Sequence, residues 1–157
     1  MKMSTRAEEV IARLKAQGLT LATAESCTGG LIGALLTDGP GASAVYKGGV
    51  ISYVNEIKHR LLGVEQETLD VCTAVSRETA HEMARGAREA VQADIGVSVT
   101  GLAGPDGDGT GRPIGLVYIG IDMEGFSFSQ ELHLTGDRAA IREQAAEAVL
   151  NMILEYA

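Results

Sequence analysis

The segment Thr23-Ala-Glu-Ser-Cys-Thr-Gly-Gly30 places a hydroxyl, a thiol and a second hydroxyl in consecutive positions before two glycines. It follows the apolar run 19–22, so we expect a turn that leads from a buried strand into a helix. Unpaired N–H groups at the start of such a helix bind a phosphate or a developing oxyanion. Ser26 and Cys27 are both candidate nucleophiles, and residue chemistry alone does not choose between them.

A structural interpretation competes with the catalytic one. Ser26 or Thr28 would then cap the helix, while Gly29 and Gly30 would only shape the turn. The composition of the turn by itself favours this structural interpretation. A catalytic function therefore needs support from the rest of the chain.

A serine nucleophile needs a base, and the three histidines share no catalytic motif with Ser26. His81 is expected on a long helix and His133 on a strand, where a structural function is more common. Metal-ligand spacing such as His-x-x-x-His is missing as well, so we expect no metal site. The remaining candidate base is a lysine whose pKa is lowered by burial.

Lys58 is expected one turn into a helix that follows a strand. Asn55 lies three residues earlier, hence on the same helix face, and Tyr53 lies at the end of the strand. A solvated surface lysine is the ordinary alternative. Lys58 becomes a candidate base only if the fold brings it to Ser26.

The apolar pattern predicts the elements that position these residues. A capping box at Thr5 and Glu8 begins a first helix, and Asn55 and Ser76 are predicted to cap later helices. Helices are expected over residues 5–17, 31–36, 56–62, 77–91 and 137–155, and strands over 19–24, 48–54, 95–100, 116–122 and 126–134. This alternation predicts an α/β protein, a three-layer α/β/α sandwich around a mixed, mostly parallel sheet with one antiparallel strand.

Three polar segments follow strand ends, at 25–30, 53–58 and 100–105. Ligands of open α/β sheets bind beyond the carboxyl ends of the strands, so we expect these segments to converge. The glycine-rich stretch 101–107 either wraps a ligand or forms a wide turn.

Composition limits the class of partner. The chain has 157 residues and a formal net charge of −8, without a basic cluster, which argues against nucleic-acid binding. A small phosphate ester remains compatible with a few local cations. Two cysteines without paired spacing indicate a reducing compartment, and we see no signal peptide and no apolar run of membrane-spanning length. A cytoplasmic protein with no membrane contact is expected, as a single domain over residues 1–157.

Five segments occur in the order typical of one family, and the sequence resembles the CinA carboxy-terminal domain family over nearly its whole length. The segments are 23–30, 49–58, Ala74-Val-Ser76, Val99-Thr-Gly-Leu-Ala-Gly-Pro-Asp-Gly107 and Gly136-Asp-Arg138. The resemblance implies nicotinamide-nucleotide amidase activity, in which nicotinamide mononucleotide is hydrolysed to nicotinate mononucleotide and ammonia during pyridine-nucleotide recycling. It also suggests a homodimer.

The same resemblance implies a Ser/Lys mechanism that needs neither a cofactor nor a metal. Ser26 matches the nucleophile, Lys58 the base, and Tyr53 a further catalytic position. Arg138 is expected to clamp the phosphate because a guanidinium matches it bidentately. Substrate-binding positions are implied at Thr28, Gly29, Gly30, Asn55, Thr100, Gly101, Gly104 and Arg138.

Two departures from the family pattern stand out. Family members generally have a glycine before the Ala-Val-Ser element, whereas this chain has Cys72-Thr73, so we expect a shifted local turn. The 157 residues do not include the molybdopterin-binding-like domain of longer members, so we expect the stand-alone form. The alternatives are a non-catalytic nucleotide-binding or interaction module of the same fold, and a thiol amidase based on Cys27.

Overall fold

The computed structural model describes the backbone of residues 3–157 and the side chains of residues 5–157. Its α-helices are α1 (Met3–Gln17), α2 (Leu31–Thr37), α3 (Asn55–Leu62), α4 (Gln66–Val71), α5 (Arg77–Val91) and α6 (Arg138–Tyr156), with a 3-10 turn at Ala42–Ala44. Its strands are β1 (Leu21–Glu25), β2 (Tyr46–Ile51), β3 (Ile95–Gly101), β4 (Leu116–Met123) and β5 (Phe126–His133).

The strands form one five-stranded sheet in the order β2-β1-β3-β4-β5. β1 pairs in parallel with both β2 and β3, whereas β4 pairs antiparallel with both β3 and β5. Four strands therefore run in one direction and β4 alone runs against them. The predicted mixed, mostly parallel sheet with one antiparallel strand is confirmed.

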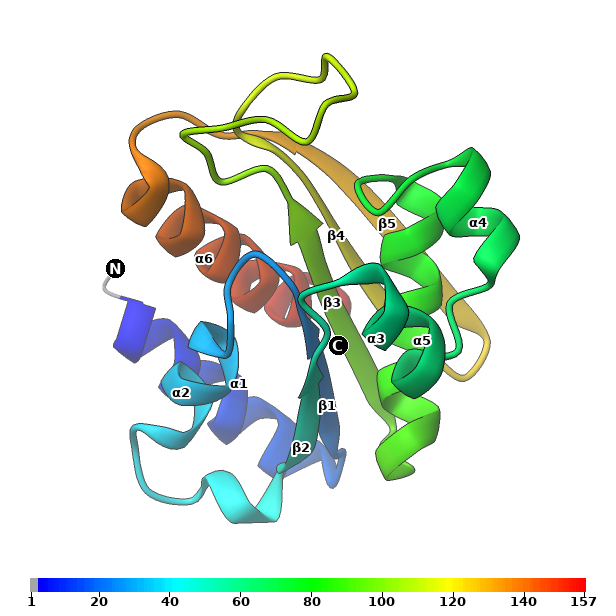
Figure 1. Cartoon of the computed structure of the whole chain (residues 1–157). Helices are drawn as coiled ribbons and strands as arrows, with labels where there is room; N and C mark the ends of the chain where they lie inside the picture. The colour runs from blue at the N-terminus through cyan, green and yellow to red at the C-terminus, as the bar shows by residue number, and fades with distance from the viewer. Residues whose placement is uncertain (1–2) are drawn as a thin grey trace.

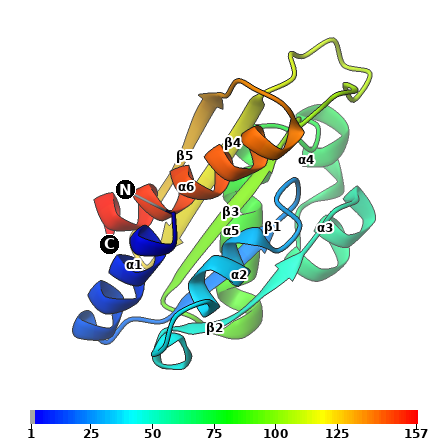
Figure 2. The ribbon, with the colours of Figure 1, turned by 90° about the vertical axis from the view of Figure 1, so that its left-hand side faces the viewer.

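Helices cover both faces of the sheet. Helices α1, α2 and α6 lie on one face and α3, α4 and α5 on the other (Figure 1), and Figure 2 shows the first of these layers in front of the sheet. The main core joins that layer to the sheet through buried side chains such as Ile32, Val97 and Ile141. A second core beneath α5 includes Ala24 and Met83. The predicted three-layer sandwich is therefore confirmed.

A glycine lets α5 pack closely against α3. A Cβ at Gly86 of α5 would lie only 1.9 Å from the carbonyl oxygen of Leu62, the last residue of α3. The two helices can therefore pack backbone against backbone only because residue 86 has no side chain. This contact holds α3, which carries Lys58, against α5.

Several predicted element ends differ from those in the structure. β2 begins at Tyr46 and ends at Ile51, whereas residues 48–54 were predicted. Asn55 is the first residue of α3 and does not cap it, because the extended Val54 occupies the cap position without a side-chain hydrogen bond. The predicted capping box also lies inside α1, which already begins at Met3.

The cap of α5 is confirmed, since Ser76 Oγ accepts a hydrogen bond from the Thr79 N–H at 3.1 Å. Helix α4 was not predicted. It has only six residues and buries only Leu69, so its sequence shows no repeating apolar stripe. None of the helices in residues 3–157 is long and apolar enough to cross a membrane.

Candidate active site

The three polar segments predicted to converge do meet at the carboxyl ends of β1, β2 and β3. Figure 1 shows the turn after β1, the start of α3 and the loop after β3 at the same end of the sheet. A cleft of about 230 Å³ lies among them. It is lined by Ser26, Cys27, Tyr53, Asn55, Lys58, Ala74, Val75, Thr100, Gly101, Leu102, Ala103, Asp108 and Arg138.

Lys58 lies at the bottom of this cleft and contacts Ser26. Its Nζ is 3.0 Å from the Ser26 Oγ, 2.7 Å from the Ser52 carbonyl oxygen and 3.3 Å from the Tyr53 carbonyl oxygen. The two carbonyls are available because β2 ends at Ile51. Lys58 is only 1% exposed, which excludes the interpretation as a solvated lysine.

Burial lowers the pKa of Lys58 from 10.5 to about 8, and the nearby Cys27 opposes this shift. A neutral amine has two N–H donors and one lone pair. If the two donors bond to the carbonyls of Ser52 and Tyr53, the lone pair faces the Ser26 hydroxyl. This arrangement suits the removal of a proton from that hydroxyl.

Cys27 is placed differently from Ser26. Its side chain packs in the main core, and burial raises the pKa of its thiol to about 11, although Lys58 and Arg142 partly oppose this shift. The thiol is therefore protonated at neutral pH and is a weak nucleophile. Of the two candidate nucleophiles, the Ser26 hydroxyl is the one that lies within hydrogen-bond distance of Lys58 Nζ.

The turn after β1 owes its shape to Glu25 rather than to a capping hydroxyl. Gly30 occupies the cap position of α2 with a φ of 110° and no side-chain cap. The buried Glu25 carboxylate instead accepts hydrogen bonds from the Ile32 and Gly33 N–H groups at 2.9 and 3.0 Å, and from the Thr28 hydroxyl at 2.6 Å. Neither Ser26 nor Thr28 caps the helix.

Four predicted substrate-binding residues do not line the cleft. Thr28 is fully buried and bonded to Glu25, and the Gly29 N–H donates to the Ser26 carbonyl at 3.1 Å. Gly30 lines a separate groove between α2 and β2. Gly104 is not a lining residue, and its carbonyl accepts from Arg138, which does line the cleft. Among residues 28–30, the N–H of Gly29 is used within the turn, and Glu25 accepts from the N–H groups of Ile32 and Gly33 further along. Substrate binding at residues 28–30 stays a prediction.

The remaining predicted residues do line the cleft. Arg138, the first residue of α6, donates to the Gly104 carbonyl at 2.6 Å and to the Tyr53 hydroxyl at 3.3 Å. Tyr53 is 60% exposed and therefore lies at the mouth of the cleft. Thr100 donates to the Ala74 carbonyl at 2.8 Å, which ties β3 to the segment before α5. Asn55 and Gly101 complete this group.

Sequence reasoning missed three residues around the cleft. Asp108 lines it from the loop after β3, and Glu25 shapes the turn from behind. Arg142 donates to the carbonyls of Cys27 and Thr28, each at 3.0 Å. Its position four residues after Arg138, on the same helix face, is a sequence signal that points to it.

The departure at Cys72-Thr73 has a visible effect. Thr73 has a φ of 71°, in the left-handed region that β-branched residues rarely adopt. Its carbonyl accepts hydrogen bonds from the Ser76 and Thr79 hydroxyls, which hold it in place. A glycine would adopt this backbone conformation without strain.

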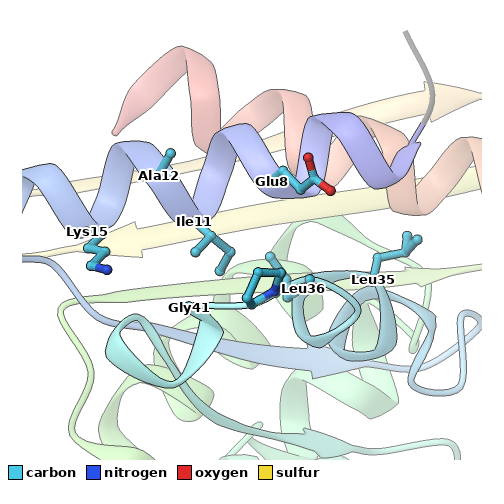
Figure 3. Close-up of a pocket in the computed structure, with 9 residues that line it drawn as sticks. Glu8, Ile11, Ala12, Lys15, Leu35, Leu36 and Gly41 are labelled. Carbon is cyan, nitrogen blue, oxygen red and sulfur yellow. The ribbon is translucent and has the colours of Figure 1, made fainter.

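A larger groove of about 390 Å³ lies between α1 and α2 (Figure 3). Ile11 and Leu36 form part of its apolar lining, and its ionisable groups are the exposed Glu8 and Lys15. None of its lining residues carries a hydroxyl or a thiol. The chemistry expected from the sequence therefore belongs to the smaller cleft at Ser26.

The fold and the cleft define a three-layer α/β/α protein with a buried Ser–Lys pair beyond the ends of its parallel strands. Residues 3–157 match the CinA C-terminal domain family, and the chain belongs to this family.

Individual relatives agree with this assignment. A relative from Halothermothrix orenii is 47% identical over 150 residues, which are 95% of this chain and 36% of the relative. The chain thus spans about a third of the length of the curated relatives that it matches. The structure of the competence/damage inducible protein CihA from Agrobacterium tumefaciens is 38% identical with a TM-score of 0.94, and covers 98% of this chain and 94% of its own. The competence damage-inducible protein A (ComA) from Klebsiella pneumoniae is 34% identical with a TM-score of 0.97, and covers 99% and 97%.

Proposed function

We propose that this chain is a nicotinamide-nucleotide amidase that hydrolyses the carboxamide of nicotinamide mononucleotide. The observation that carries the proposal is the 3.0 Å contact between a buried lysine of lowered pKa and the Ser26 hydroxyl. The choice of substrate follows from the resemblance to the family, and the residues that line the cleft are compatible with this substrate.

In the first half of the reaction, neutral Lys58 accepts the hydroxyl proton as the Ser26 Oγ attacks the amide carbon. The carbonyl oxygen becomes an oxyanion in the tetrahedral intermediate. Lys58, now an ammonium, donates its proton to the amide nitrogen. The C–N bond then breaks, ammonia leaves, and Ser26 carries a nicotinoyl ester.

In the second half, water replaces ammonia at the amide position. Lys58 accepts a proton from this water as the oxygen attacks the ester carbon. The bond to Ser26 Oγ breaks, the hydroxyl recovers its proton from Lys58, and nicotinate mononucleotide leaves. The sum consumes one water molecule and releases one ammonia, with no change of oxidation state.

The cleft can also hold the nucleotide part of this substrate. Apart from Lys58, Arg138 is the cation among the residues that line the cleft, and its guanidinium lies at the mouth beside the Tyr53 hydroxyl. A phosphate there would accept paired hydrogen bonds from Arg138. Tyr53 and Asn55 line the same cleft as the Ser26–Lys58 pair.

The site favours catalysis over the alternative of a non-catalytic binding module. Burial of a lysine without a carboxylate partner costs stability, and Lys58 has no such partner among the described residues. A binding module gains nothing from this arrangement. An amidase needs it, because a base with a pKa near 8 matches the operating pH.

The test is release of ammonia from nicotinamide mononucleotide by the purified, chelator-treated chain. We expect turnover by the wild type, a loss of at least about 10³-fold in Ser26→Ala and Lys58→Ala, and near-wild-type turnover in Cys27→Ala. No ammonia from the wild type would refute the amidase. Activity that survives in Ser26→Ala and disappears in Cys27→Ala would identify the thiol as the nucleophile, and inhibition by the chelator would contradict the metal-free mechanism.

A further inference from the structure

The turn that carries Ser26 is closed by one hydrogen bond and held from outside by an arginine. The Ser26 carbonyl accepts from the Gly29 N–H at 3.1 Å, so these four residues form a β-turn. The carbonyls of its two middle residues, Cys27 and Thr28, accept from Nε and Nη2 of Arg142. A guanidinium presents its donors in a rigid fork, so this one side chain fixes the Cys27–Thr28 and Thr28–Gly29 peptide planes. The second of these planes carries the Gly29 N–H, which in turn holds the Ser26 carbonyl.

Peptide planarity determines where the N–H groups of the turn point. In a trans peptide the C=O and the following N–H point in opposite directions. Because the Ser26 carbonyl is directed to Gly29 inside the turn, the Cys27 N–H is directed out of it. Only Ser26 and Cys27 of this turn line the cleft, and the Ser26 N–H already donates to the Val99 carbonyl at 3.1 Å.

The Cys27 N–H is therefore the backbone donor that the turn offers on the side of the cleft. An N–H immediately after a nucleophile is a common oxyanion donor, since it lies beside the carbon under attack. Cys27 is buried, with 6% of its surface exposed, and it lines the cleft beside Ser26.

We propose that Arg142 is a positioning residue that acts through the Gly29 N–H and the Ser26 carbonyl to keep the Cys27 N–H directed at the oxyanion formed on the substrate amide. Arg142 reaches the turn from α6 and does not touch the reacting atoms. Its guanidinium has no carboxylate partner within the described chain, so its donors serve the turn alone. Glu25 holds the same turn from the other side through the Thr28 hydroxyl. This inference rests on the proposed amidase function.

Steady-state ammonia release from nicotinamide mononucleotide by Arg142→Ala and Arg142→Lys tests the inference. An oxyanion donor acts in the transition state, so we expect kcat to fall about 10- to 100-fold in Arg142→Ala while KM changes less than about 3-fold. Arg142→Lys keeps the charge and loses the fork, so its kcat should lie between those of Arg142→Ala and the wild type. Millimolar guanidinium chloride should raise kcat of Arg142→Ala several-fold, and sodium chloride at the same concentration should not.

Arg13→Ala is a matched control, because Arg13 also donates to a backbone carbonyl, that of Leu154, far from the turn. It should keep the wild-type kcat. An inactive wild type would refute the amidase function itself. With an active wild type, an unchanged kcat in Arg142→Ala, or a loss confined to KM, would overturn the inference. A loss that guanidinium does not restore, accompanied by a lowered melting temperature, would assign Arg142 a structural function only. If Arg142→Ala fails to fold, Arg142→Lys is tested in its place. A fall in kcat with a nearly unchanged KM supports the inference, and an unchanged kcat or a loss confined to KM overturns it.

Discussion

The shortest hydrogen bond of Lys58 joins its Nζ to the carbonyl oxygen of Ser52, at 2.7 Å. This carbonyl belongs to the first residue beyond β2, where the strand no longer uses it. The bond directs one N–H of the amine away from Ser26 and leaves the lone pair free to face the hydroxyl. The premature end of β2 is thus part of what prepares the base.

The rate should depend on pH through Lys58. Only the neutral amine accepts the Ser26 proton, and burial lowers the pKa of Lys58 to about 8. We therefore expect kcat/KM for ammonia release to rise about tenfold per pH unit below pH 8 and to level off above it. Initial rates between pH 6 and pH 9.5 measure this rise and the plateau. A profile that stays flat between pH 6 and pH 9 would show that Lys58 is not the base.

The unfolding free energy should also depend on pH through Lys58. The folded pKa of Lys58 lies below its ordinary value of 10.5, so the unfolded chain binds more protons between about pH 8 and pH 10.5. Stability therefore rises with pH across this window and is lost as pH falls through it. Relative to Lys58→Met, the wild type should gain about 2 kcal/mol in unfolding free energy between pH 7 and pH 10.

Urea unfolding of both proteins at the two pH values measures this difference, and other titrating groups cancel in the comparison. Lys47→Met is a suitable control for the loss of one positive charge, since Lys47 is an exposed lysine of β2. A wild type and Lys58→Met whose stabilities change in parallel with pH would show that Lys58 has an ordinary pKa.

Arg138 should discriminate between a nucleotide and a nucleoside. Its guanidinium lies at the cleft mouth, and an interaction of this kind with a phosphate contributes about 1.5–3 kcal/mol. Arg138→Ala should therefore raise KM for nicotinamide mononucleotide about 10- to 100-fold and change kcat/KM for nicotinamide riboside much less. Arg138→Lys should retain part of the preference. Equal losses on both substrates would place the phosphate elsewhere.

The sequence predicted the layers, the five strands along the chain and the convergence at Ser26, because long apolar segments and strand-end polar residues are local signals. It did not predict the hydrogen-bond partners of the turn after β1. The bond from Glu25 to the α2 N–H groups requires knowledge of where the buried strand ends, and that from Arg142 joins segments 115 residues apart. Likewise, the choice of Ser26 over Cys27 depends on which side chain faces the core, which no local pattern encodes.

The structural alternative at Thr28, a cap of α2, is wrong for a related reason. A threonine before two glycines at a helix start is typical of a cap or an anion site. Here the preceding carboxylate competes for the same donors, and a buried Glu25 accepts from two N–H groups and one hydroxyl. A buried carboxylate requires such donors, so it outcompetes a neutral hydroxyl for them.

The strained Thr73 offers a stabilising substitution. Its φ of 71° costs about 1–2 kcal/mol for a residue with a Cβ, and its Oγ1 is buried without a hydrogen-bond partner among the described residues. Thr73→Gly removes both costs, against about 0.5–1 kcal/mol of added backbone entropy in the unfolded chain. We expect a net gain of about 1 kcal/mol in unfolding free energy, measured by urea denaturation. The carbonyl that accepts from Ser76 and Thr79 is kept, so α5 should remain capped.

Gln92 provides the matched comparison for Thr73. It also has a positive φ, of 53°. Unlike Thr73, its side chain is not β-branched and has no hydroxyl. The backbone terms alone then apply, and Gln92→Gly should gain only about 0.5 kcal/mol in unfolding free energy. If Thr73→Gly instead destabilises the protein, its hydroxyl or methyl group contributes packing that outweighs the backbone strain. A gain equal to that of Gln92→Gly would attribute the effect to the left-handed backbone alone and not to the orphaned hydroxyl.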